Sequence, residues 1–185
     1  MCCKETDGTV VPVETLVIGY GNTLRGDDGA GPAVVEKLTA LLPRGTSRKA
    51  KLIACEQLIP ELAVDIASCK RIIFIDASLA LPAGRISITP IHEEPCDMRM
   101  GHYTTPGMVL AMAQSAFGAC PRAWLAAIGC QSMEINDQLT PTVAAAVDRL
   151  ARHLHRGMAQ WSKGKPFLPE LLPDSEPAGT EKQQG

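Results

Sequence analysis

The sequence predicts a single α/β domain, whose mostly parallel, twisted sheet of about five strands is covered by helices on both faces. Short apolar segments alternate with segments of helical period from Thr15 to Trp161, which is typical of strands joined by crossover helices. The strand candidates are largely continuous apolar runs, as expected for strands buried on both faces. With 185 residues, 45% of them hydrophobic, the chain has the length and the core of one ordinary domain.

The candidate strands are short segments rich in apolar and β-branched residues. They are Thr15–Tyr20, Leu52–Cys55, Arg71–Ala77, Arg85–Thr89 and Ala123–Cys130. Arg85–Thr89 alternates apolar and polar residues and follows Arg71–Ala77 after a connection too short for a crossover helix. We therefore expect it to be an antiparallel strand at the edge of the sheet.

Capping residues and prolines mark the expected helices. These are Gly29–Leu42, Leu58–Ser68, a helix from Thr105 to Phe117, and a long last helix that begins at Thr140. The last helix carries an apolar stripe at helical spacing, formed by Val143, Val147, Leu150 and Leu154. This stripe is expected to lie against the sheet.

The two ends of the chain differ from the middle in composition. We expect residues 1–14 to form a flexible N-terminus and residues 15–162 to form the domain. From 163 to 185 the sequence is rich in Pro, Glu, Lys, Gln and Gly, with little to bury. A disordered C-terminal tail is therefore expected.

Charge and hydropathy argue against two classes of partner. The formal net charge is -2, so no field of one sign favours nucleic acid or an anionic membrane. No apolar run approaches the roughly 20 residues that span a bilayer, and the polar N-terminus does not resemble a signal peptide. The seven cysteines are scattered without a C-x-x-C pair and are expected to be free thiols. We therefore expect a cytoplasmic protein that binds neither nucleic acid nor membranes.

The densest motif is the glycine-rich segment Gly19–Gly31, between the first strand and the first helix. A dinucleotide-binding turn would need a glycine where Leu24 stands. A phosphate-binding P-loop would need Lys and then Ser or Thr after Gly26, but Asp27 and Asp28 follow. A carboxylate near a helix N-terminus stabilises the helix by roughly 0.3–1 kcal/mol. This effect explains the presence of one aspartate but not the composition of the whole loop. Two carboxylates instead attract a cation.

This segment resembles the N-terminal motif of the [NiFe]-hydrogenase maturation endopeptidases. The resemblance continues in order to about Leu150 through four further motifs, which are Gln57–Ala63, Phe74–Ala77, Gly101–Pro106 and Leu139–Val143. In that family an acidic residue after the first strand, an aspartate closing the third strand and a histidine before the next long helix bind a metal. The resemblance implies that Asp28, Asp76 and His102 are the metal-binding and catalytic residues.

The expected places of these residues agree with their chemistry. Open α/β sheets bind their ligands beyond the carboxyl ends of the strands. Asp28 and Asp76 are expected at these ends, and His102 can reach the same edge. Oxygen and nitrogen ligands suit a divalent ion such as nickel or zinc. Asp27 is interpreted first as a loop or helix-start residue and second as an auxiliary ligand. An aspartic dyad, in which Asp28 and Asp76 share a proton without a metal, stays open.

The resemblance implies a peptidase, aspartic-type or metal-assisted, that removes the C-terminal extension of a [NiFe]-hydrogenase large-subunit precursor after nickel insertion. The nickel is carried by this precursor, which is the expected partner, and another divalent cation in the free enzyme is the second candidate cofactor. Two alternatives stay open: a metallopeptidase or amidohydrolase with its own metal, and a nickel-dependent binding module that does not cleave. The sequence has neither a Gly-x-Ser-x-Gly nor a His-Glu-x-x-His motif.

Overall fold

The computed structural model describes residues 13–43, 49–94 and 104–165, and its strands form one five-stranded sheet. The strands are β1 (Val13–Tyr20), β2 (Ala50–Cys55), β3 (Cys69–Ser78), β4 (Ile86–Ile91) and β5 (Arg122–Gly129). Their order is β2-β1-β3-β5-β4, in which only β4 is antiparallel to its neighbour. The mostly parallel sheet and its antiparallel edge strand are confirmed.

Helices connect the parallel strands. In chain order they are the 3-10 helix η1 (Gly26–Gly29), α1 (Ala30–Leu41), α2 (Leu62–Ala67), α3 (Pro106–Phe117) and α4 (Pro141–Trp161). The side chain of Thr105 caps α3 by accepting from the backbone N–H of Met108 at 3.2 Å. None of the helices within the described ranges is long and apolar enough to cross a membrane.

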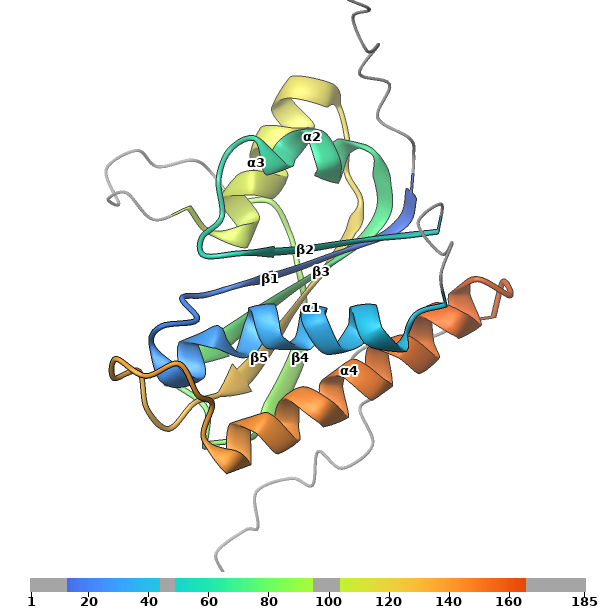
Figure 1. Cartoon of the computed structure of the whole chain (residues 1–185). Helices are drawn as coiled ribbons and strands as arrows, with labels where there is room; N and C mark the ends of the chain where they lie inside the picture. The colour runs from blue at the N-terminus through green and yellow to red at the C-terminus, as the bar shows by residue number, and fades with distance from the viewer. Residues whose placement is uncertain (1–12, 44–48, 95–103, 166–185) are drawn as a thin grey trace, which may run out of the picture.

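The helices cover both faces of the sheet (Figure 1). One face packs against α1 and α4, and the other against α2 and α3. The stripe of α4 is fully buried in the first of these cores, as its spacing predicts; its members are Val143, Val147, Leu150 and Leu154. The predicted α/β class, with helices on both faces, is therefore confirmed.

Strand β3 shows how the two faces divide the side chains. Ile73 and Ile75 belong to the core under α1 and α4, whereas Ile72 and Phe74 belong to the core under α2 and α3. Side chains alternate along a strand, so Asp76 continues the series of Ile72 and Phe74. Its carboxylate therefore emerges on the face that α2 and α3 cover.

The structure corrects the start of α2. This helix begins at Leu62 rather than at Leu58, and the residues before Leu62 form a tighter turn. The backbone N–H of Leu62 donates to the carbonyl of Ile59, and that of Ala63 donates to the carbonyl of Pro60. These bonds span three residues, so the segment is a 3-10-like turn that precedes the helix.

The ends of the fold lie close to the expected boundaries. The described chain begins in β1 at Val13, which is the register partner of Cys69 in β3, and α4 ends at Trp161. Residues 1–12 and 166–185, which include nearly all of the predicted flexible ends, lie outside the described residues. The expectation for these ends stays a prediction.

Candidate functional site

Two carboxylates lie where the sheet changes direction of winding. From β1 the chain passes to β2 on one side, and β3 then pairs with β1 on the other side. The carboxyl ends of β1 and β3 thus flank the topological switch point, where open α/β sheets bind their ligands. Asp28 lies in η1, which follows β1, and Asp76 lies near the carboxyl end of β3. The structure brings both residues to the predicted edge.

Close backbone packing places Asp28. Gly21 has a φ of 136°, and a Cβ there would collide with the carbonyl of Asp28. A Cβ on Gly31 would meet the backbone carbonyls of Tyr20 and Ile75. The backbone N–H of Asn22 also donates to Oδ2 of Asp28 at 2.8 Å. The glycines of the loop therefore let η1 and α1 lie directly against β1 and β3.

Asp27 is buried and points into the protein, with 0% of its surface exposed. Its carboxylate accepts from the backbone N–H groups of Gln131 at 2.8 Å, Ser132 at 3.1 Å and Thr140 at 2.7 Å. The Thr140 hydroxyl donates a fourth hydrogen bond at 3.1 Å. Burial opposes ionisation, but these hydrogen bonds hold the pKa of Asp27 below its ordinary value. Asp27 thus joins η1 to the segment between β5 and α4.

Asp76 is half-buried and hydrogen-bonded to Tyr20. The Tyr20 hydroxyl donates to Oδ2 of Asp76 at 2.7 Å, and the backbone N–H of Ala77 donates to the same carboxylate. Burial raises the pKa of Asp76; these two hydrogen bonds oppose that shift, and the negative charge of Asp28 adds to it. Asp28 and Asp76 are therefore close enough to repel each other.

Tyr20 is the residue that sequence reasoning missed. It is the last residue of β1, and it packs against the core under α2 and α3. Burial, followed by the charge of Asp76, raises the pKa of Tyr20 far above its ordinary range, so its hydroxyl stays a donor. The sequence shows a tyrosine at a strand end, but only the order and register of the strands show that β3 and Asp76 are beside it.

His102 lies outside the described residues, so its place relative to the two carboxylates stays a prediction. The nearest described element is α3, which begins at Pro106 on the face where Asp76 emerges. Among residues 13–43, 49–94 and 104–165, no three His, Cys, Asp or Glu side chains group as a metal site. The described structure places Asp28 and Asp76 at the predicted edge of the sheet, and the metal-binding role of all three residues stays a prediction.

Cys130 follows β5 close to the carboxylates. It is buried, and its backbone N–H donates to the carbonyl of Ser78. Burial raises the pKa of the Cys130 thiol, and the negative charges of Asp27, Asp28 and Asp76 raise it further. A thiol in this setting is a poor nucleophile, because the thiolate is the reactive form.

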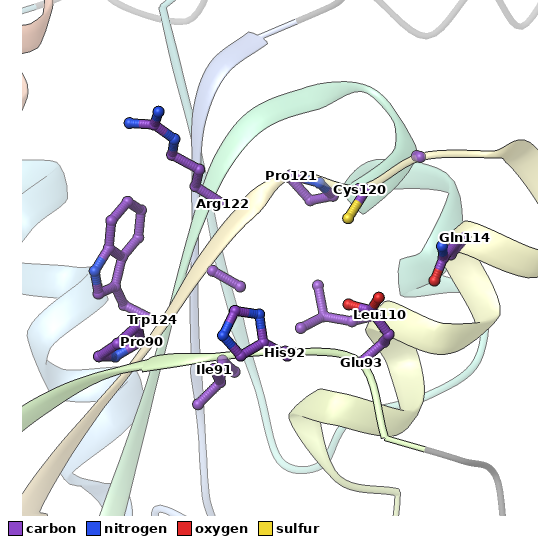
Figure 2. A pocket seen from close by; sticks show the side chains of 12 residues that line it. Pro90, Ile91, His92, Glu93, Leu110, Gln114, Cys120, Pro121, Arg122 and Trp124 are labelled. Atoms are coloured by element: carbon purple, nitrogen blue, oxygen red, sulfur yellow. The ribbon is translucent and has the colours of Figure 1, made fainter.

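Two cavities lie at different edges of the sheet. One of about 340 Å³ is lined by His92, Gln114 and Arg122 among others, and it lies where β5 begins (Figure 2). Asp76 instead pairs with Ala127, near the other end of β5. Another of about 330 Å³ is lined by Thr23, Gly26 and Gly29 of the loop after β1, and by parts of α1. The lining of the second cavity includes Gly26 and Gly29, which belong to η1 together with Asp28, but not Asp28 itself.

Large apolar side chains are exposed around the same edge. Leu24, Ile59, Leu79 and Ile135 have 63%, 41%, 71% and 93% of their surface exposed. They lie in the segments that follow β1, β2, β3 and β5, respectively. The backbone N–H of Asn136 donates to the carbonyl of Leu24, which holds two of these segments together. We call these four residues the apolar rim.

The fold and the paired carboxylates define the chain as an α/β protein with an acidic site at the switch point of its sheet. No protein-family model matches the chain, and no curated protein matches it significantly. Solved structures do match.

The hydrogenase 2 maturation peptidase from Thaumarchaeota archaeon SCGC_AB-539-E09 is 27% identical, with a TM-score of 0.56, covering 83% of this chain and 99% of that one. The hydrogenase maturating endopeptidase HybD from Escherichia coli is 25% identical, with a TM-score of 0.61, covering 82% and 94%. The [NiFe] hydrogenase maturation protease HycI from Thermococcus kodakarensis KOD1, at 20% identity, shares the fold with a TM-score of 0.64, covering 78% and 91%.

These likenesses support the resemblance to the hydrogenase maturation endopeptidases that the motifs of the sequence indicate.

Proposed function

We propose that this protein is a peptidase that removes the C-terminal extension of a [NiFe]-hydrogenase large-subunit precursor after nickel insertion. Asp28, Asp76 and His102 recognise the nickel that the precursor carries. The observation that carries the proposal is the pair of carboxylates, Asp28 and Asp76, at the switch point of a maturation-protease fold.

Electrostatics supports a cation at this position. Asp76 is half-buried, and the charge of Asp28 raises its pKa. A divalent cation between two such carboxylates removes their mutual repulsion and compensates part of the cost of burying charge. Oxygen ligands alone favour hard cations, whereas an added imidazole ligand suits nickel or zinc. His102 is the imidazole that we propose, from the segment before α3.

The apolar rim supports a polypeptide substrate. Isolated exposed aliphatic side chains are ordinary, but four of them on loops around one edge are typical of a surface that a partner covers. A precursor chain lying across this edge would bring its scissile amide beside Asp28 and Asp76. The apolar rim therefore supports a protein substrate at this edge of the sheet.

Two chemical subtypes fit the carboxylates. In a metal-assisted reaction, a divalent ion supplies polarisation of the amide carbonyl and a more acidic bound water. In an aspartic-type reaction, Asp76 is the carboxyl that exchanges a proton, because burial and the charge of Asp28 raise its pKa. Removing free divalent metal from the enzyme and the buffer, while the precursor keeps its nickel, tests for an ion of the enzyme's own, because only a reaction that needs such an ion then stops.

We further propose that the protein acts in the cytoplasm. Cys55, Cys69, Cys120 and Cys130 are free in the described structure. Free cysteines fit a reducing compartment.

The decisive experiment mixes the purified protein with nickel-loaded and nickel-free precursor. The proposal predicts cleavage of the nickel-loaded precursor alone. Cleavage of both forms would instead indicate a metallopeptidase or amidohydrolase with its own metal. Binding of the nickel-loaded form without cleavage would indicate a binding module.

A further inference from the structure

The carboxylate of Asp76 is held by a partner that comes from another strand. The register of β1 and β3 pairs Gly19 with Ile75, which brings the next residues, Tyr20 and Asp76, side by side. Both side chains emerge on the face covered by α2 and α3, since Tyr20 packs against that core and Asp76 continues the series of Phe74. Their contact is therefore a product of the strand register.

This contact restricts the rotation of the carboxylate. A carboxylate at the end of a half-buried strand turns freely about its terminal torsion unless hydrogen bonds hold it. The hydroxyl of Tyr20 donates to Oδ2 at 2.7 Å, a short distance typical of a hydrogen bond to a charged acceptor. Because the aromatic ring is itself packed in the core, the donor has a fixed place.

We propose that Tyr20 is a positioning residue of the site, which acts through Asp76. Its hydroxyl holds Oδ2 so that the carboxylate presents one orientation to the metal and the scissile amide of the precursor. Groups that orient a metal ligand in this way commonly change affinity or rate by about 10- to 100-fold when they are removed. This role rests on the proposed function of Asp76.

Tyr20→Phe in the full chain tests the role, because it removes the hydroxyl and keeps the packed ring. We expect an essentially unchanged melting temperature and a kcat/KM on nickel-loaded precursor lowered by about 10- to 100-fold. The affinity of the isolated protein for Ni²⁺, measured by calorimetry, should fall by a similar factor. A merely structural hydroxyl would lower the melting temperature and leave kcat/KM and Ni²⁺ affinity in place.

Two comparisons make this test specific. Thr39→Val removes a hydroxyl that donates to the carbonyl of Val35 near the C-terminal end of α1, whereas Asp28 precedes the N-terminal end of that helix. This variant should change neither kcat/KM nor Ni²⁺ affinity. Adding Tyr20→Phe to Asp76→Asn should cause little further loss of Ni²⁺ affinity, because Tyr20 acts through the carboxylate. Independent losses in the double variant would overturn the proposal.

The outcomes for Tyr20 and for the proposed function are separable. If the wild-type protein binds Ni²⁺ but cuts no precursor, the proposed function fails, while weaker Ni²⁺ binding by Tyr20→Phe still upholds the positioning role. If the wild-type protein cuts and Tyr20→Phe matches it in kcat/KM and Ni²⁺ affinity, the positioning role alone is wrong. A wild-type protein that neither binds Ni²⁺ nor cuts rejects both.

Discussion

Asp76→Asn tests the site most directly, because it changes a charge and almost no volume. An asparagine oxygen still accepts from the hydroxyl of Tyr20, so the contact at the strand end persists. The lost charge no longer attracts a cation. At about 4 Å and an effective dielectric constant near 20, one pair of unit charges interacts by about 4 kcal/mol. We therefore expect cleavage of nickel-loaded precursor to fall by roughly 10³-fold.

The same substitution is expected to leave the fold intact. Burial raises the pKa of Asp76, so its ionised form is a cost to the folded state at pH 7. This cost in folding free energy is fully present above the raised pKa of the folded protein, and it disappears as the pH falls below the ordinary pKa of the unfolded chain. Asp76→Asn removes it, so the free energy of unfolding at pH 7 should be unchanged or higher, as measured by urea denaturation.

A matched control separates local from general charge effects. Asp148→Asn removes a carboxylate on the surface of α4 that pairs with Lys37. The variant protein should cleave nickel-loaded precursor at the wild-type rate. Circular dichroism first establishes that each variant is folded. Cleavage by folded Asp76→Asn within about tenfold of the wild type would refute the assignment of Asp76, because so small a loss is about 1.4 kcal/mol.

Three further predictions concern Asp27, the cysteines and the C-terminal tail. Asp27→Asn places an amide NH₂ among four donors, so we expect it to destabilise the fold by about 1–3 kcal/mol in urea denaturation and to reduce cleavage less than Asp76→Asn does. Because the pKa of Asp27 is lowered in the folded protein, the ionised carboxylate stabilises the fold above its ordinary pKa, and this stabilisation is lost on acidification. Asp27→Asn should therefore lose less stability than the wild type below about pH 4. Replacing all seven cysteines by Ala or Ser should preserve cleavage even where stability falls, and a folded but inactive variant would indicate a thiol mechanism. Removing residues 166–185 should leave the melting temperature nearly unchanged, and a fall of many degrees would show that the tail packs on the domain.

Local patterns were sufficient to predict the architecture. The buried stripe of α4 and the continuous apolar run of β3 are properties of one segment each, so their periodicity is visible in the chain. The antiparallel pairing of β4 followed from the length of one connection. Asp28 and Asp76 were assigned to the carboxyl edge because each lies at or after the end of a predicted strand. His102 was predicted from its motif, and its place stays a prediction.

Tertiary structure decided which of these residues meet. The loop sequence left Asp27 and Asp28 as two neighbouring carboxylates, but the approach of the segment after β5 buries Asp27 among donors and leaves Asp28 at the edge. Likewise, Tyr20 and Asp76 are 56 residues apart and touch because β1 and β3 are neighbours in register. Hydrophobic periodicity depends on local sequence, whereas strand order and register come from packing the whole sheet between its helices. The sequence by itself therefore determined the fold class and the edge that carries the acids, and tertiary packing assigned each acid its partner.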